Sequence, residues 1–503
     1  MDHNTGLILQ KRAHLTPDLC ALYDVASGLR FTYAELDRRA NRAANMFLAS
    51  GIKKGDRVGL LLMNGTEFIE SLFGLAKIGA ITVPLNWRLL ADELTFILND
   101  CGVSLLVFDA NFIAVAEALQ LGNNTKVERW LCVGEQQGQT ESKFICDNYS
   151  SLTLSASATV PSIDTQDDDD DLFIMYTSGT TGSPKGVVHT HDTCMWATIT
   201  NSATNASRLG DRFLTILPLF HIGALNPMIT CIKSGVSLVV SRSFDADKTW
   251  RLINDEKIST MLAVPAMLNA MLQVYPAGEI DHSQLRYCIV GAAPVPESII
   301  NTYHDMGISV RQAYALTESC GSACIVDERE TKKMVGSTGK AYFHTEVKII
   351  DEGGNDSAAN QAGEIVMRGR HMMKRYWNNP SATADTLRNG WLHTGDVGVM
   401  DEEGYITIKD RIKDMIISGG ENIYPAEVES ALVSHANIVD AAVIGRPDPK
   451  WGESPLAFVV TKESSHKSEP LTEADVIEYC KTQLASYKCK RSINPVLQSH
   501  SPR

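Results

Sequence analysis

Residues 176–186 read YTSGTTGSPKG, in which a strand-like ending leads into a loop rich in hydroxyl groups and glycine. Glycine lets backbone N–H groups approach phosphate oxygens, Ser and Thr donate further hydrogen bonds, and Lys185 adds a mobile cation. The loop is not a Walker A loop, because Gly186 rather than Ser or Thr follows Lys185. It therefore suits a polyphosphate, although a Gly/Ser surface turn fits the same composition.

Apolar runs of strand length alternate with helical patterns on both sides of this loop. Thr32 and Glu35 have capping-box spacing, and Gly51 supplies a stop, so a helix is expected over about residues 33–50. This rhythm predicts an α/β fold whose large, multi-layer N-terminal domain has buried sheets and flanking helices. The strand candidates are VGLLLM, SLLVF, FLTIL, VSLVV, TMLAV and YCIVG, and the best helical pattern is EFIESLFGLAKIGA.

After Tyr405 the sequence changes to short segments that alternate between strand-like and helical patterns. These segments are YITIK, DMIISGG, the helical AEVESALVSH, AAVIG and LAFVV, followed by a helix near residues 473–486. A chain of 503 residues exceeds what one hydrophobic core usually organises. We therefore expect an N-terminal domain over residues 1–410 and a small, mobile α+β C-terminal domain over residues 411–503.

The bulk properties exclude several classes of protein. A net charge of −14 and a pI near 5.4 argue against broad attachment to nucleic acid or anionic lipid. The N-terminus lacks the features of a signal peptide, and no run approaches 18 apolar residues. A cytoplasmic protein is expected, which leaves peripheral membrane contact and a homodimer open.

Two features of the sequence resemble metal-binding sites but are better explained in other ways. The eleven cysteines lack CxxC spacing, so we interpret them as reduced, mostly buried thiols rather than zinc ligands. The five aspartates Asp167 to Asp171 repel one another, and a solvated acidic linker entering a strand explains them better than an ion site.

The whole chain resembles the adenylate-forming superfamily of AMP-binding enzymes and acyl-CoA synthetases. Within it, QAYALTESCG and KDMIISGGENIYPAEVES most resemble bacterial fatty-acyl-CoA ligases and aryl-CoA ligases. The phosphate loop is followed in family order by LPLFHIGA (217–224), VGAAP (290–294), YALTE (314–318), LHTGD (392–396), DRIKD (410–414) and SGGENIYPAEVE (418–429).

The resemblance implies ATP, Mg²⁺ and coenzyme A as cofactors or cosubstrates and a small-molecule carboxylic acid as substrate. Charge management dominates such chemistry, because pyrophosphate leaves the α-phosphate when the carboxylate attacks. Thr317 is expected to touch the α-phosphate and Glu318 to hold Mg²⁺. The pyrophosphate is expected to lie against Thr177, Ser178, Gly179, Thr180, Thr181, Gly182 and Lys185.

The resemblance also implies residues for the nucleoside. Tyr314 is expected to stack on adenine. Asp396 and Arg411 lie fifteen positions apart, as the family's two ribose-hydroxyl contacts do, and either residue alone could belong to a surface salt bridge. The segment that lines the adenine and acyl pockets is expected to be Gly291, Ala292, Ala293 and Pro294.

Four further features concern the thiol half of the reaction. His221 resembles a gate between the carboxylate site and the pantetheine tunnel, with a satisfied core histidine as the competing reading. Lys413 occupies the family's hinge position. The tunnel wall and the CoA contact are expected at Gly419, Gly420 and Trp451. Lys488, Lys490 and Arg491 fit either CoA phosphates or a solvated basic face.

The C-terminal pattern departs from the family. Members end with a segment like PRNPSGK, whose lysine bridges the carboxylate and the α-phosphate, whereas this chain reads LASYKCKRSINPVLQSHSPR. The terminal catalytic-lysine segment is therefore expected just beyond Arg503. A shortened sequence, an incomplete gene and a true loss of adenylation all fit this pattern.

The sequence supports one function with several alternatives. The main hypothesis is an acid–thiol ligase that makes acyl-CoA from a medium- or long-chain fatty acid. The alternatives are an aryl- or feruloyl-CoA ligase, a stand-alone adenylation enzyme that loads a carrier protein, and a non-catalytic nucleotide sensor. The acyl pocket is expected around His221, Leu225, Pro265 and Gly291, and its size cannot be derived from one sequence.

Overall fold

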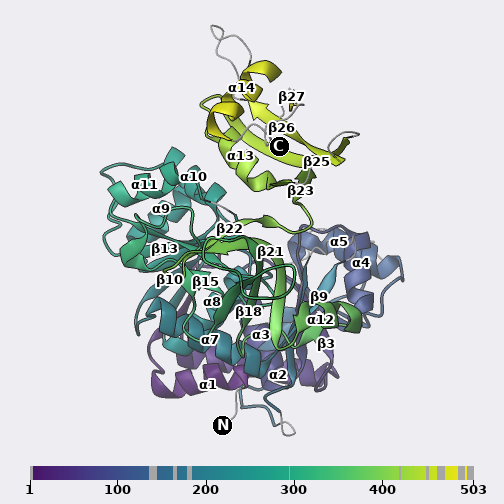
Figure 1. The fold of residues 1–503 in the computed structure, drawn as a ribbon. Coiled ribbons are helices and arrows are strands. Elements are labelled where there is room, and N and C mark those ends of the chain that lie inside the picture. Colours follow the sequence, from purple (N-terminus) through teal and green to yellow (C-terminus); the bar gives the residue numbers. More distant parts are fainter. Residues whose placement is uncertain are drawn as a thin grey trace. The chain divides into compact units, whose positions relative to one another are not determined.

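The computed structural model divides into two compact units (Figure 1). The first unit holds residues 1–346 and 367–392, and the second holds residues 347–366 and 393–503. The structure describes residues 4–134, 144–162, 167–177, 184–293, 295–418, 421–448, 452–461, 471–484 and 493–495.

The first unit contains a nine-stranded sheet with the order β16–β15–β14–β13–β12–β10–β11–β1–β2 in the described residues. The strands from β1 to β14 in this order pair in parallel, and β2, β15 and β16 pair antiparallel at the two edges. The strands are β1 Cys20–Asp24, β2 Arg30–Thr32, β10 Arg212–Thr215, β11 Ser237–Val240, β12 Thr260–Ala263, β13 Tyr287–Val290, β14 Ser309–Tyr314, β15 Cys324–Ile325 and β16 Lys340–Ala341.

A second sheet of this unit has the order β19–β9–β8–β4–β3–β5–β6–β7. Its central strands are parallel, and β8 and β9 form an antiparallel pair. The strands are β3 Arg57–Leu61, β4 Ile81–Pro84, β5 Val103–Asp109, β6 Arg129–Val133, β7 Asp147–Asn148, β8 Asp171–Thr177, β9 Lys185–Thr190 and β19 Arg375–Tyr376. The short β20, Leu387–Arg388, pairs with Trp391 and Leu392.

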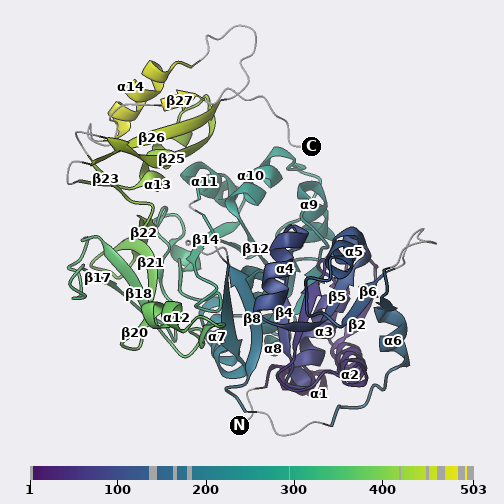
Figure 2. The same ribbon diagram turned by 90° about the vertical axis from the view of Figure 1, so that its right-hand side faces the viewer.

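Helices cover both sheets and fill the space between them. One core joins α1, α2, α3 and α8 to strands of both sheets, a second packs α9, α10 and α11 on the nine-stranded sheet, and a third packs α4 and α5 on the other sheet (Figure 2). The layers therefore run helix, sheet, helix, sheet, helix, as the α/β prediction requires. The helices are α1 Thr5–Leu15, α2 Tyr33–Ala49, α3 Thr66–Lys77, α4 Ala91–Asp100, α5 Ile113–Leu121, α6 Tyr149–Ser155, α7 His191–Asn205, α8 Ile222–Ser234, α9 Ala246–Asp255, α10 Pro265–Gln273, α11 Glu297–Asp305 and α12 Pro380–Thr386, with 3₁₀ turns at Ala110–Phe112 and Glu328–Glu330.

The start of α2 shows how local sequence sets an element. The Thr32 hydroxyl accepts from the Glu35 N–H at 3.2 Å, and the Glu35 carboxylate accepts from the Thr32 N–H at 2.8 Å. These two bonds form the predicted capping box, which satisfies backbone donors that a helix start leaves unpaired. The helix expected near residues 33–50 is confirmed, and each predicted apolar run overlaps a strand.

The aspartate run is less solvated than the sequence suggested. Asp171 is the first residue of β8 and lies 2.6 Å from Arg375, while Asp170 pairs with Lys54 at 2.7 Å. Asp169 pairs with Lys374 at 2.8 Å. The prediction of a purely solvated linker was therefore wrong in part, because basic side chains distant in sequence neutralise the run.

The second unit is smaller and contains two sheets. In one of them β18 pairs with β17 and β21, and β22 pairs with β21; the other has the order β24–β23–β26–β25, with β27 beside β26. A core of ten buried residues, including Ile416, Val428 and Val459, packs α13 and α14 on the latter sheet. The elements are β17 Glu346–Ile350, β18 Gly363–Arg368, β21 Trp391–Met400, β22 Ile406–Arg411, β23 Ile416–Ser418, β24 Glu421–Ile423, α13 Pro425–Val433, β25 Ile438–Asp448, β26 Gly452–Thr461, α14 Glu473–Gln483 and β27 Ile493–Pro495.

A large α/β unit and a smaller C-terminal unit agree with the predicted fold class. The proposed boundary between residues 410 and 411 stays a prediction. Across the described ranges, every helix is too short or too polar to cross a bilayer.

Candidate active site

The parallel strands of the nine-stranded sheet bring several motifs to one edge. PLFHIGA follows β10, VGAAP follows β13, and YALTE spans the end of β14. The carboxyl ends of parallel strands meet at the same edge, which is where open α/β sheets bind ligands. Segments separated by about a hundred residues in the sequence therefore converge on one place.

The phosphate-loop motif lies in the antiparallel hairpin between β8 and β9. Thr177, the last residue of β8, is the cross-strand partner of Lys185, the first residue of β9. The hairpin places both residues at the base of the loop. The predicted loop residues Ser178, Gly179, Thr180, Thr181 and Gly182 lie outside the described residues.

Glu318 and Lys185 both lie against Tyr376. The Tyr376 hydroxyl donates to Glu318 Oε1 at 2.7 Å, and Lys185 Nζ lies 5.2 Å from the centre of the Tyr376 ring. Burial, followed by the neighbouring Glu318 carboxylate, raises the pKa of Tyr376, so its hydroxyl remains a donor at neutral pH. Within the described ranges, Glu318 Oε2 has no hydrogen-bond partner and Lys185 has no carboxylate partner. One anionic and one cationic group are thus available to a ligand.

A buried histidine fixes the backbone at Thr317. His189 Nε2 donates to the Thr317 carbonyl at 2.8 Å, because a carbonyl can only accept. Burial lowers the pKa of His189 to about 4, so the ring is neutral at physiological pH. The turn closes with the Cys320 N–H donating to the same carbonyl at 3.0 Å and with Cys320 at φ +51°. Thr317 and Glu318 are therefore held in one backbone conformation.

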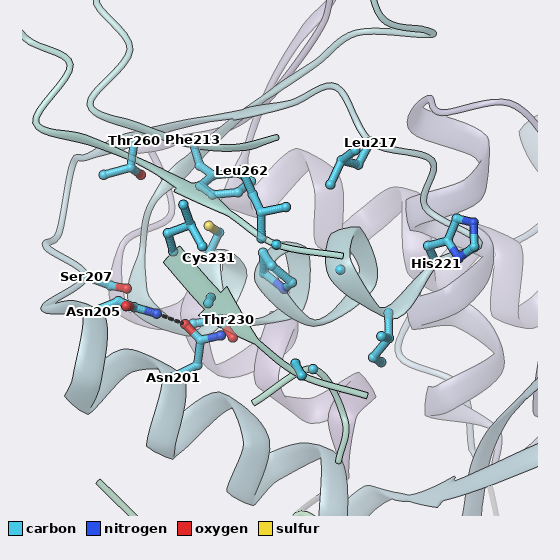
Figure 3. A pocket seen from close by; sticks show the side chains of 18 of the residues that line it. Asn201, Asn205, Ser207, Phe213, Leu217, His221, Thr230, Cys231, Thr260 and Leu262 are labelled. Atoms are coloured by element: carbon cyan, nitrogen blue, oxygen red, sulfur yellow. Dashed lines mark hydrogen bonds between the residues drawn. The ribbon is translucent and has the colours of Figure 1, made fainter. Parts of the chain in front are cut away.

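A cavity of about 310 Å³ opens beside these motifs (Figure 3). Its sheet wall comes from alternate residues of two neighbouring strands and the residue just after each: Thr260, Leu262 and Val264 at β12, and Tyr287, Ile289 and Gly291 at β13. This spacing follows from the period of two in a strand, which places every second side chain on the same face. The opposite walls come from α7 and α8.

The predicted pocket residues are divided between this cavity and the core. His221, Gly291 and Ala292 line the cavity. Leu225, which is fully buried on α8, and Pro265, the first residue of α10, do not line the cavity. Ile222 and Val264, neighbours of the predicted positions, line the cavity instead. Helix and strand periodicity explains the difference, because successive residues point in different directions.

His221 and Gly291 have distinct structural reasons for their positions. His221 is exposed just before α8, so it is not a core histidine, and its ring centre lies 4.6 Å from that of Phe220. A Cβ on Gly291 would lie 3.0 Å from the Ala313 carbonyl oxygen, so a side chain would displace β14. Ala292 has φ +71° and, like Ala293, is exposed, while Pro294 lies outside the described residues.

Tyr314 is buried, with 7% of its surface exposed, at the end of β14. Its neighbours Ala313 and Ala315 line the cavity. The predicted stacking of Tyr314 on adenine stays a prediction.

In the second unit, β21 and β22 bring the two predicted ribose residues together. Asp396 and Arg411 are direct cross-strand partners, with Arg411 Nε 3.6 Å from Asp396 Oδ1. Asp396 is buried, whereas 58% of the Arg411 side chain is exposed. The fifteen positions that separate them are therefore the length of chain that runs along β21, through the turn and back along β22.

Lys413 is exposed in the turn between β22 and β23. The turn is closed by the Asp414 N–H donating to the Arg411 carbonyl at 3.1 Å. The remaining predictions for this unit, which concern Gly419, Gly420, Trp451, Lys488, Lys490 and Arg491, lie outside the described residues.

Sequence reasoning missed Tyr376 and His189. Tyr376 belongs to the two-residue strand β19, which reaches Glu318 only because β19 pairs with β9. No motif marks that pairing. His189 lies on β9 three residues beyond the loop motif, so its position was a usable signal, but its contact with Thr317 spans 128 residues.

Comparisons with known proteins match both the N-terminal and the C-terminal parts of the chain. The family model of the AMP-binding enzymes matches residues 9–377, and that of the AMP-binding enzyme C-terminal domain matches residues 427–501. The long-chain-fatty-acid–CoA ligase FadD13 of Mycobacterium tuberculosis is 42% identical over 97% of this chain and 94% of its own length. The feruloyl-CoA synthase of an Amycolatopsis species is 35% identical over 96% of this chain and 93% of its own.

A solved structure shares the fold across both units. The o-succinylbenzoate coenzyme A synthetase MenE of Bacillus subtilis, in complex with ATP and magnesium ion, has a TM-score of 0.85 and 31% identity, and the match covers 97% of this chain and 95% of MenE. The chain therefore belongs to the AMP-binding enzyme family, and it is an ATP-dependent, AMP-forming acyl-CoA ligase.

Proposed function

We propose that this enzyme activates a medium- or long-chain fatty acid as the acyl-adenylate and transfers the acyl group to coenzyme A. The observation that carries the choice of acid is the cavity, whose sheet wall presents Leu262, Val264 and Ile289. Apolar walls favour an aliphatic chain, because each buried methylene contributes about 0.8 kcal/mol. The 42% identity to a long-chain-fatty-acid–CoA ligase supports the same choice.

The first half-reaction needs groups that stabilise charge on phosphate. A carboxylate oxygen of the fatty acid attacks the α-phosphorus, a P–O bond forms, and the bond to pyrophosphate breaks. Lys185 and the loop that follows Thr177 hold the departing pyrophosphate, and Thr317 touches the α-phosphate. Preorganised groups of this kind act without reorganisation cost at the moment of reaction.

The residues present fit a magnesium ion that arrives with ATP. Mg²⁺ prefers octahedral oxygen ligands and is usually held by one or two carboxylates plus substrate phosphates. Glu318 Oε2 is available for such a bond, since Tyr376 occupies only Oε1. Among the described residues, no group of three or more metal-ligating side chains forms a dedicated cage. When bound, the ion would neutralise phosphate charge at Glu318.

Adenosine and thiol contacts complete the proposal. Tyr314 stacks on adenine, Gly291 to Pro294 line the base and the start of the acyl chain, and Asp396 with Arg411 holds the ribose hydroxyls. In the second half-reaction the CoA thiolate attacks the acyl carbonyl carbon, a C–S bond forms, and AMP leaves. His221 gates the thiol's approach, and Gly419, Gly420 and Trp451 contact coenzyme A.

A panel of acids with labelled CoA and ATP tests this function. Saturated acids of six to eighteen carbons should give thioester, with kcat/KM for the best of them at least about tenfold above that for ferulic acid, which corresponds to about 1.4 kcal/mol of apolar burial. A preference for ferulic acid would establish the aryl-CoA ligase alternative. Adenylate without thioester would favour a carrier-loading enzyme, and binding without turnover would favour a sensor.

We further propose that the C-terminal domain, residues 411–503, changes pose about Lys413 between the two half-reactions. Lys413→Pro should impair one half-reaction at least about tenfold more than the other, because proline fixes φ near −65°. The variant removes no hydrogen bond, since the Lys413 N–H has no acceptor within the described part of the chain. Pyrophosphate release and thioester formation from preformed acyl-AMP measure the two steps separately.

Lys413→Ala is the matched control, because it removes the same side chain and leaves φ free. It should keep the ratio of the two rates close to that of the wild type. Equal losses in both steps for Lys413→Pro, or the same imbalance in Lys413→Ala, would remove Lys413 as the hinge.

A further inference from the structure

The cavity has chemically different ends. His221 and Gly291 lie at the end where β10 and β13 finish, next to the motifs described above. Figure 3 shows polar side chains at the opposite end, where the same sheet's strands begin. These polar residues are Asn201 and Asn205 on α7, Ser207 and Asp211 in the following loop, and Thr260 at the start of β12.

Asn205 is fixed by its neighbours. Its Oδ1 accepts from Arg311 Nη1 at 3.1 Å, its backbone carbonyl accepts from the Tyr287 hydroxyl at 2.8 Å, and its Nδ2 donates to Asn201 Oδ1 at 2.8 Å. Only 4% of its surface is exposed. Because the last bond engages the Asn201 oxygen, it also fixes the direction of the Asn201 amide group.

Asn201 therefore presents a donor to the cavity. The residue is 8% exposed and lines the cavity, yet its Nδ2 has no acceptor anywhere in the described residues. A donor that faces the cavity and has no protein partner gains a hydrogen bond when a ligand oxygen reaches it. The hydroxyls of Ser207 and Thr260 likewise lack hydrogen-bond partners among the residues described, and Thr260 is 7% exposed.

The carboxylate that lines this end is already paired. Asp211 pairs with Arg286, and its Oδ2 also accepts from the Arg208 N–H at 3.0 Å. A second carboxylate on a ligand would meet the Asp211 carboxylate, whereas a neutral oxygen would meet the donors of Asn201 and Thr260. The end is thus suited to a hydroxyl or ketone oxygen.

Two measures give the separation of the ends. From Tyr287 to Gly291 along β13 the rise is about 13 Å, at about 3.3 Å per residue. From His221 to Thr230 along α8 the rise is also about 13 Å, at 1.5 Å per residue. One extended residue spans about 3.6 Å over three backbone bonds, which is about 1.2 Å per bond. An extended acyl chain that advances by the same amount needs about ten to eleven bonds to reach from one end of the cavity to the other.

We infer that the acyl substrate bears a neutral oxygen, as a hydroxyl or ketone, about ten to eleven bonds from its carboxyl carbon, and that Asn201 and Thr260 bind it. This inference rests on the proposed function, because it takes the carboxyl group to lie near His221 and Gly291. It makes the pocket selective for oxygenated chains rather than for chain length alone.

The experiment compares dodecanoic acid with 11-hydroxydodecanoic and 11-oxododecanoic acids, which carry their oxygen eleven bonds from the carboxyl carbon, using both kcat/KM for thioester formation and Kd without ATP. At least one oxygenated acid should be favoured by about tenfold, the scale of one or two neutral hydrogen bonds. Asn201→Leu and Thr260→Val should each lower this ratio at least about threefold. Thr204→Val on α7 is the control, since Thr204 does not line the cavity and its side chain bonds only to Thr200 and Phe343 within the described ranges.

Ratios measured within one variant are independent of how much protein is folded, and Thr260→Val is nearly isosteric if Asn201→Leu fails to fold. Wild-type enzyme that treats all three acids alike in Kd would overturn the inference, as would a preference that survives both substitutions. Failure to form any thioester contradicts the proposed function instead, and the Kd ratios still decide the inference.

Discussion

Glu318→Ala is expected to slow acyl-AMP formation by about two to three orders of magnitude, the usual scale for one lost charge-stabilising group. Glu318 offers a carboxylate oxygen to a ligand, and among the described residues its side chain makes only one hydrogen bond, to Tyr376. Lys185→Ala should cause a loss of the same order. Pyrophosphate release at saturating ATP and Mg²⁺ measures both.

The fold should survive these changes. Removing the Glu318 side chain leaves the buried Tyr376 hydroxyl without its acceptor, which costs about 1 kcal/mol. In a chain of this size that corresponds to a fall in Tm of only about 2 °C. A large fall in Tm would assign the loss of rate to unfolding.

Two variants separate charge from packing. Glu318→Gln keeps an acceptor for Tyr376 but removes the negative charge, so it should be nearly as slow as Glu318→Ala. Lys374→Ala removes a lysine that pairs with Asp169 and Asp171 at the far end of β8 from the loop, and it should retain wild-type rates. Wild-type pyrophosphate release in Glu318→Gln would show that its charge is not used.

Local sequence predicted the elements of this fold well. The capping box at Thr32 and Glu35 makes its two hydrogen bonds within four residues, so nothing distant is needed to place α2. Apolar strand runs such as SLLVF carry the same local information, because a strand covered on both faces must be apolar throughout. Asp396 and Arg411 were recognised by motif, and a single hairpin brings them together.

The active-site environment depends on pairings that no local pattern specifies. Tyr376 reaches Glu318 through the pairing of the edge strand β19 with β9. The cavity wall follows from the register that places Thr260 beside Tyr287, and without that register Leu225 and Pro265 were as plausible as Val264. Motifs therefore identified the reacting groups, whereas the shape that selects the acid required the folded sheet.

Three buried histidines make the first unit sensitive to acid. Burial lowers the pKa of His189, of His191 and of His371 to about 4. His191 Nδ1 accepts from the Thr5 N–H at 3.0 Å. Protonation of Nδ1 would turn it into a donor, so this hydrogen bond would be lost and two N–H groups would face each other. His371 Nε2 lies 3.0 Å from the Ser322 carbonyl, and its Nδ1 is buried with no partner in the described residues.

The direction of the pH effect follows from these lowered values. In the unfolded chain each of these histidines binds a proton below about pH 6.5, whereas in the folded chain it does so only below about pH 4. Acid therefore favours the unfolded chain, which binds more protons. Stability should be fully present above pH 6.5 and should fall progressively towards pH 4. At pH 5 each histidine contributes a loss of about 2 kcal/mol, which is large against a typical stability of about 5–15 kcal/mol.

Denaturant unfolding of the full chain between pH 7.5 and 5 measures this loss. His191→Asn keeps an acceptor for the Thr5 N–H, since Asn Oδ1 can replace imidazole Nδ1. The asparagine amide does not bind a proton in this pH range. The variant should therefore reduce the fall in unfolding free energy over this range by about 2 kcal/mol. His14→Gln, at an exposed position in α1, is the matched control and should leave the fall unchanged. An equal fall in wild type and His191→Asn would mean that His191 is not the group whose protonation opposes folding, and His189→Gln, which keeps a donor for the Thr317 carbonyl, would then test the next member of the set.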